Sequence, residues 1–117
     1  MTADAPEPFV FGKIRLVKEG TGTCILSYGP IMKMAVELAS RIERERAQSV
    51  ALVSCHTLKP LDREGIANIL KRFRTVIVVE EHSEHGGLGA QVKQIAWDAG
   101  ARCALHTFGL KDRFIHL

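Results

Sequence analysis

A segment rich in glutamate and histidine, followed by a glycine turn, holds the residues best suited to chemistry. Residues 80–85 read Glu-Glu-His-Ser-Glu-His, and Gly86-Gly-Leu-Gly89 follows directly. Glycines ahead of a helix let backbone N–H groups converge on an anion, which the positive end of the helix dipole also attracts. Small residues also allow tight strand-to-helix packing, and no lysine is placed to reach a phosphate. The pattern leaves both interpretations open, and a possible anion or effector site would comprise His82, Gly86, Gly87 and Gly89.

The same segment gives weaker signals for metal binding and for acid–base chemistry. His82 and His85 lie in an expected loop with few further ligands nearby, whereas zinc requires at least three protein ligands on a rigid frame. Glu80 and Glu81 would face opposite sides of a strand, so we expect one of them to cap nearby N–H groups. We therefore assign no catalytic residue, no cofactor-binding residue and no metal ligand.

The cysteines indicate a reducing environment. Cys24, Cys55 and Cys103 are odd in number and far apart, which is typical of free intracellular thiols. Cys55 and His56 are adjacent and would face opposite sides of a strand, so His56 is poorly placed to activate the thiol. We expect Cys55 to be a buried structural residue.

The composition is that of an ordinary globular domain. The chain has 117 residues, of which 46% are hydrophobic and 25% charged, which favours one core. A net charge of +3 is too small to argue for a nucleic-acid partner. No apolar run approaches the roughly 18 residues of a membrane span, and residues 1–8 lack the regions of a signal peptide. We expect a cytoplasmic protein that contacts no membrane.

The elements that must position these residues alternate between apolar strands and amphipathic helices. We predict strands over residues 13–18, 23–28, 50–54, 75–79 and 102–108, and helices over 30–46, 62–73 and 88–99, after a flexible arm over 1–8. This order implies a mostly parallel sheet covered on both faces. The first connection is too short for a parallel crossover, so the first strand must pair antiparallel or lie at an edge.

Ligands of open α/β sheets collect beyond the carboxyl ends of the strands. The segments expected there are 28–30, 55–57, 80–89 and 106–108. The basic segment 71–74 instead ends a helix, where positive charge complements the helix dipole. The residues alone thus predict an α/β domain with a possible anion or partner surface and no convincing catalytic constellation.

Several segments resemble, in order and spacing, the C-terminal domain of the transketolase family. They are GKIRLVKEG (12–20), CILSYG (24–29), TLKPLD (57–62), VVEEH (78–82) and GGLGAQV (86–92). The resemblance covers residues 9–117, and the form EEHSEHGGLGAQV most resembles the C-terminal subunits of split, two-chain transketolases. The family domain also closes deoxyxylulose-phosphate synthases and the beta subunits of 2-oxo-acid dehydrogenases.

The resemblance implies a three-layer α/β/α sandwich with a five-stranded mixed sheet, its first strand antiparallel at or near an edge. It also implies thiamine-diphosphate chemistry, the transfer of a two-carbon ketol unit between sugar phosphates. In this family the diphosphate, the magnesium and the activating glutamate belong to the two preceding domains, whose GDG…N motif is absent here. We therefore expect the chain to bind no cofactor, to be inactive alone, and to partner those domains or subunits, with a dimer formed through this domain.

Other functions remain open on sequence alone. The chain could be a stand-alone regulatory module that binds a small anion, or part of a 2-oxo-acid dehydrogenase beta subunit that docks partner proteins. The family continues past the segment matched by Asp112-Arg-Phe114 into a last helix, whereas this sequence stops at Leu117. We expect the domain over residues 9–117 to lack that helix.

Overall fold

The computed structural model describes residues 13–55, 61–81 and 87–110. The strands are β1 (Arg15–Lys18), β2 (Thr23–Ser27), β3 (Val50–Ser54), β4 (Thr75–Glu81) and β5 (Ala104–Leu110). The helices are α1 (Met32–Arg46), α2 (Arg63–Arg72) and α3 (Leu88–Ala99), with a short 3₁₀ turn, η1 (Gly29–Ile31), ahead of α1. This confirms the predicted order of elements, and the expected arm over residues 1–8 lies outside the described residues.

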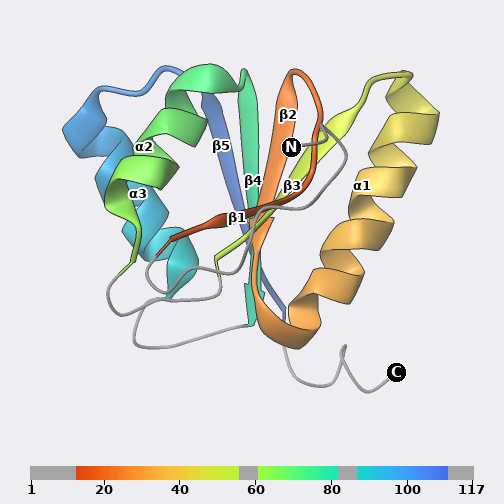
Figure 1. Cartoon of the computed structure of the whole chain (residues 1–117), viewed down its shortest axis with the longest axis horizontal. Coiled ribbons are helices and arrows are strands. Elements are labelled where there is room, and N and C mark those ends of the chain that lie inside the picture. Colours follow the sequence, from red (N-terminus) through yellow and green to blue (C-terminus); the bar gives the residue numbers. More distant parts are fainter. Residues whose placement is uncertain (1–12, 56–60, 82–86, 111–117) are drawn as a thin grey trace, which may run out of the picture.

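The sheet is mixed, as the sequence predicted. Its strand order is β1-β3-β2-β4-β5, and every neighbouring pair is parallel except β1 and β3, which are antiparallel. The first strand therefore satisfies both expectations at once, because it is antiparallel and lies at an edge. Helix α1 covers one face of the sheet while α2 and α3 cover the other, which gives three layers (Figure 1).

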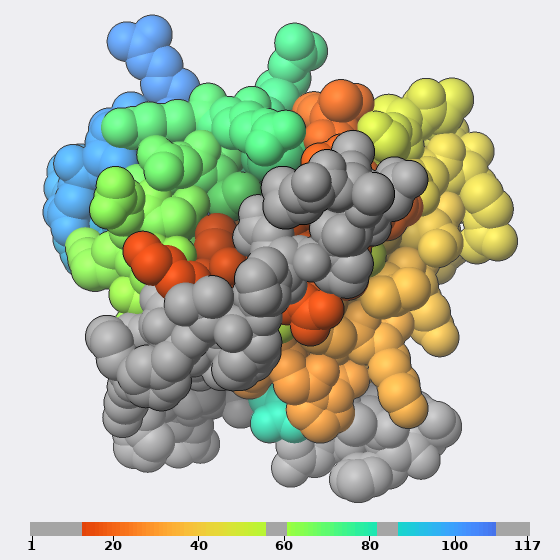
Figure 2. All heavy atoms as spheres, in the orientation of Figure 1, coloured from red at the N-terminus to blue at the C-terminus, as the bar shows by residue number. Residues whose placement is uncertain are grey.

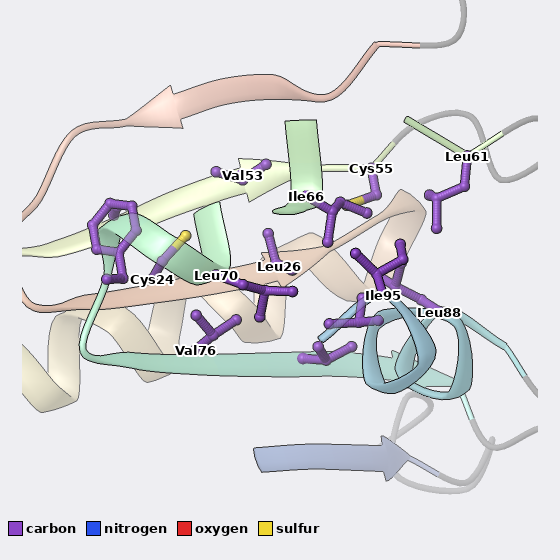
Figure 3. Packing of buried hydrophobic residues seen from close by; sticks show 14 residues of the cluster. Cys24, Leu26, Val53, Cys55, Leu61, Ile66, Leu70, Val76, Leu88 and Ile95 are labelled. Atoms are coloured by element: carbon purple, nitrogen blue, oxygen red, sulfur yellow. The ribbon is translucent and has the colours of Figure 1, made fainter. Parts of the chain in front are cut away.

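The core has two parts because the central strands are buried on both faces. All of β2 is buried, and its alternate residues face opposite layers: Cys24 and Leu26 pack beneath α2 and α3, and Ile25 packs beneath α1. Figure 3 shows the larger cluster, in which Ile66, Leu70 and other side chains of the helices meet the sheet. This packing fixes the strand ends that carry the candidate site.

The helix boundaries agree with the prediction to within two residues. Pro30 lies in the first turn of η1, where its missing N–H costs no hydrogen bond, as expected. The apolar stripe of α1 ends near Ile42, but the helix continues to Arg46. Its last turn faces solvent, and Arg41 pairs with Glu45 at i,i+4, so charged residues extend the helix beyond its apolar face.

The last strand is shifted from its predicted place. The sequence predicted a strand over 102–108 that brings His106 and Phe108 to the carboxyl edge, but β5 covers Ala104–Leu110. His106 therefore lies in mid-strand opposite Ile77, and the prediction for this segment was wrong. The reason is that a short apolar run marks a strand without marking its ends, which are set here by the pairing with β4.

Within the described residues, no helix is long and apolar enough to cross a membrane.

Candidate functional site

The carboxyl edge of the sheet is joined across its strands by hydrogen bonds. The N–H of Cys55, just after β3, donates to the carbonyl of Ser27 at the end of β2, at 2.8 Å. The Ser27 hydroxyl donates in turn to the Val79 carbonyl in β4, at 2.7 Å, and this side chain is fully buried. The ends of β2, β3 and β4 therefore form a fixed frame for the residues that follow them.

A buried carboxylate at this edge caps α3. Glu80 and Glu81 both belong to β4, and as predicted they face opposite sides, Glu80 buried and Glu81 exposed. The Glu80 side chain accepts a hydrogen bond from the Gly89 N–H in the first turn of α3, at 2.8 Å. A negative charge there complements the positive end of the helix dipole. This confirms the prediction that one of the two glutamates caps nearby N–H groups.

Gly89 is required by the closeness of this contact. A Cβ added at Gly89 would lie under 3.0 Å from Glu80 Oε2 and 3.2 Å from Cγ2 of Thr107 in β5. A larger side chain would therefore separate α3 from the strand ends. Of the two interpretations of the glycine turn, tight strand-to-helix packing is confirmed at this position.

A second carboxylate–glycine pair begins α2. Asp62 is the N-cap, and its Oδ1 accepts from the Gly65 N–H at 3.0 Å, which confirms its predicted capping role. Its Oδ2 also accepts from the Ile14 N–H at 3.1 Å, which joins the segment before β1 to the start of α2. A Cβ at Gly65 would again lie under 3.0 Å from the carboxylate. The contact with Ile14 had no signal in the sequence because 48 residues separate the partners.

The proposed anion site is only partly described by the structure. His82 and Gly86 lie outside the described residues, while Gly87 precedes α3 as its N-cap and Gly89 lies within the first turn. The Gly89 N–H already donates to Glu80, so an external anion at this helix start would meet a carboxylate. The effector site formed by these residues stays a prediction. Among the described residues, no three His, Cys, Asp or Glu side chains are grouped to hold a metal ion.

The two buried cysteines are structural, as expected for Cys55, which follows β3 at the carboxyl edge, whereas Cys24 lies near the start of β2. Burial raises the pKa of the Cys24 and Cys55 thiols to about 12, so both remain protonated and unreactive near neutral pH. Tyr28, which follows β2, has its pKa raised by burial and by the nearby negative charge of Glu80. None of these groups is activated for nucleophilic or general-base chemistry.

The chain is similar to known proteins along most of its length. The family model "Transketolase, C-terminal domain" matches residues 12–116. The 1-deoxy-D-xylulose-5-phosphate synthase of Bacteroides fragilis is 32% identical over 109 residues, and the match covers 93% of this chain and 17% of the relative. A Thermus thermophilus enzyme of the same name is 36% identical, over 89% of this chain and 16% of the relative.

A solved structure is also similar to the chain over nearly all of its length. The chain is similar to "Split gene transketolase, inactive beta4 tetramer", with a TM-score of 0.77 and 28% identity, over 96% of this chain and 36% of that one. The chain thus spans about a sixth of the length of these curated relatives and about a third of the solved chain. The mixed sheet and its antiparallel first strand are those that the family resemblance implied. With the match over residues 12–116, they show that the chain belongs to the transketolase C-terminal domain family.

Proposed function

We propose that this chain is the C-terminal domain or subunit of a thiamine-diphosphate-dependent transketolase, and that it serves assembly and not catalysis. The proposal is carried by the two carboxylates at the carboxyl edge, which both serve as helix caps. Asp62 accepts an N–H group of α2, and Glu80, in β4, accepts one of α3, which leaves neither free for acid–base work. The match of residues 12–116 to a domain within much longer relatives supports the same view.

At the carboxyl edge, the start of α3 does not fit a diphosphate. The N–H of Gly89, which lies where a helix start could bind a phosphate, donates to Glu80 instead. The carboxylate would repel a diphosphate at this position. We therefore place cofactor binding, and the chemistry that the cofactor supplies, in the preceding domains or a separate subunit.

The first prediction concerns the isolated chain. We expect no magnesium-dependent heat of binding when it is titrated with thiamine diphosphate, and no ketol transfer between sugar phosphates. Adding a chain that carries the first two transketolase domains should restore ketol transfer in proportion to complex formed. Calorimetry and a coupled sugar-phosphate assay measure the two results.

Two outcomes would contradict the proposal. Micromolar, magnesium-dependent binding of thiamine diphosphate that persists in the double variant Arg74→Gln with Arg102→Gln would place the cofactor in this domain. A restored complex that makes 1-deoxy-D-xylulose 5-phosphate instead of transferring ketol units would assign the chain to the synthase branch that the curated relatives represent. The stand-alone anion module and the dehydrogenase fragment gain no support from a described contact.

We propose further that copies of the chain associate with one another through the open side of β5. The solved relative is described as a beta4 tetramer that is inactive, so its subunits assemble without a catalytic partner. Within the described part of this chain, β5 is an edge strand paired with β4, and Phe108 on it is 51% exposed. An open strand edge and an exposed aromatic side chain are features of self-association surfaces.

The second prediction tests that surface. Phe108→Glu should lower the association constant at least tenfold, because it places a charge in the apolar part of the interface. Val36→Glu is the matched control, since Val36 is an exposed apolar residue on α1, which packs mainly on β2 and β3. Light scattering across a concentration series measures both. Equal association of Phe108→Glu and the unmodified chain would exclude this surface.

A further inference from the structure

The amino-terminal edge of the parallel strands carries a hollow that the sequence did not predict. Its volume is about 470 Å³, and it lies where the last residues of α2 and α3 lead into β4 and β5. Its lining consists of residues 70–74 and 99–103. The Glu80–Gly89 contact lies at the other end of β4, so this hollow is separate from the carboxyl-edge site.

Four exposed cations lie around the hollow. They are Lys71, Arg72, Arg74 and Arg102. Figure 2 shows side chains of the segments that begin β4 and β5 projecting beyond the upper edge of the molecule. Within the described ranges, no carboxylate forms an ion pair with any of the four. Asp98, the nearest acidic residue along α3, is paired with Arg63 at 3.1 Å.

The positive charge around the hollow is larger than the charge needed to balance the dipoles of α2 and α3. The carboxyl end of each helix carries about half a unit of negative charge, so two helix ends amount to about one unit. Lys71 and Arg72, in the last turn of α2, meet that requirement as predicted from the sequence. Arg74 and Arg102 lie beyond the helices and add charge that the dipoles do not need.

The backbone holds these two arginines in place. The Arg74 N–H donates to the Gly22 carbonyl, and the Arg74 carbonyl accepts from the Ala104 N–H, both at 2.9 Å. Gly100, with a φ of 64°, ends α3, and the Ala101 N–H donates back to the Ala96 carbonyl at 3.0 Å. The turns that carry Arg74 and Arg102 are thus fixed before any ligand binds.

The lining also has an apolar part. Leu70 and Phe73 are buried beneath the hollow, and the Arg72 guanidinium lies 5.3 Å from the centre of the Phe73 ring. A hollow of a few hundred cubic ångströms with few convergent polar groups suits a small ligand. Guanidinium groups bind phosphate through paired N–H donors, a geometry that lysine lacks.

From this arrangement we infer that the hollow binds a small phosphorylated molecule that carries at least two negative charges. Phosphate oxygens would lie against Arg74 and Arg102, and the uncharged part of the ligand would lie over the Leu70–Phe73 side. Such a site would be independent of the proposed assembly role, because it uses neither the carboxyl edge nor the open side of β5.

The test uses the 117-residue chain and inorganic pyrophosphate as the probe. Titration in about 150 mM salt, followed by amide NMR shifts, should saturate, with the largest changes at residues 72–74 and 100–103. The double variant Arg74→Gln with Arg102→Gln should weaken binding at least tenfold. The matched control, Arg44→Gln with Arg46→Gln, removes the same charge from the end of α1 and should change affinity less than twofold.

Three results would overturn the inference. They are shifts that do not saturate, shifts spread over all basic surfaces, and equal weakening in the two double variants. Thermal denaturation of both variants checks that each is folded, so loss of binding reports on the hollow.

Discussion

Replacing Gly20 with alanine should lower the free energy of unfolding by about 3 kcal/mol or more, the largest effect expected for any single methyl group in this chain. Because β3 lies between β1 and β2, the connection between those two strands must pass beside the start of β3. A Cβ at Gly20 would lie under 3.0 Å from backbone atoms of Val50 and Ala51. Backbone in a central strand cannot move aside without breaking its pairing with both neighbours.

Gly100→Ala is the control for this substitution. Gly100 has a φ of 64° and open space around its Cα, so alanine there meets only the backbone strain, about 1 kcal/mol. Urea denaturation of the two variants should rank Gly20→Ala well below Gly100→Ala in stability. Equal losses would show that the strand connection can relax, and would remove the steric argument.

Replacing Glu80 with alanine should lower the free energy of unfolding by about 2–4 kcal/mol. The change leaves the buried Gly89 N–H without its acceptor and opens space between β4 and α3. Glu81→Ala is the matched control, since the neighbouring carboxylate is exposed and its loss should cost less than about 0.5 kcal/mol.

A double-mutant cycle tests the pairing directly. Gly89→Ala alone should be destabilising, because the new methyl group would collide with the Glu80 carboxylate. In the Glu80→Ala background the same change should cost much less, since only the contact with Thr107 remains and alanine favours a helix over glycine. A coupling energy of about 1–3 kcal/mol between the sites is expected. Additive losses would mean that Glu80 and Gly89 act independently.

Much of the architecture could be predicted from local patterns. The strands β2 and β3 were placed within a residue of their observed bounds because each is a short apolar run between turn residues. Asp62 was identified as a cap because an acidic residue after a proline often begins a helix. The boundaries of β5 were missed, since its pairing with β4, and not its own composition, decides where it ends.

The candidate site was less accessible to sequence reasoning. The glutamates at the end of β4 indicated a cap, but which of them faces inward depends on the layer that covers each side of the sheet. The interpretation of the glycine turn as an anion site could not take account of Glu80, because its carboxylate reaches Gly89 only after β4 and α3 pack together. The cationic hollow combines residues 70–74 with 99–103, which are brought together by the parallel pairing of β4 with β5.

By itself, the sequence determined the class of fold, the restriction of β1 to an antiparallel or edge position, and the Asp62 cap of α2. These follow from periodicity and from interactions between residues close in the chain, and the family resemblance follows from motifs in the same order and spacing. Only the tertiary structure decided that Glu80 caps α3 and that a side chain at Gly20 would collide with the backbone of β3. It also decided that arginines from two turns line one hollow. Each depends on contacts between distant segments, and burial and backbone pairing, not local preference, select them.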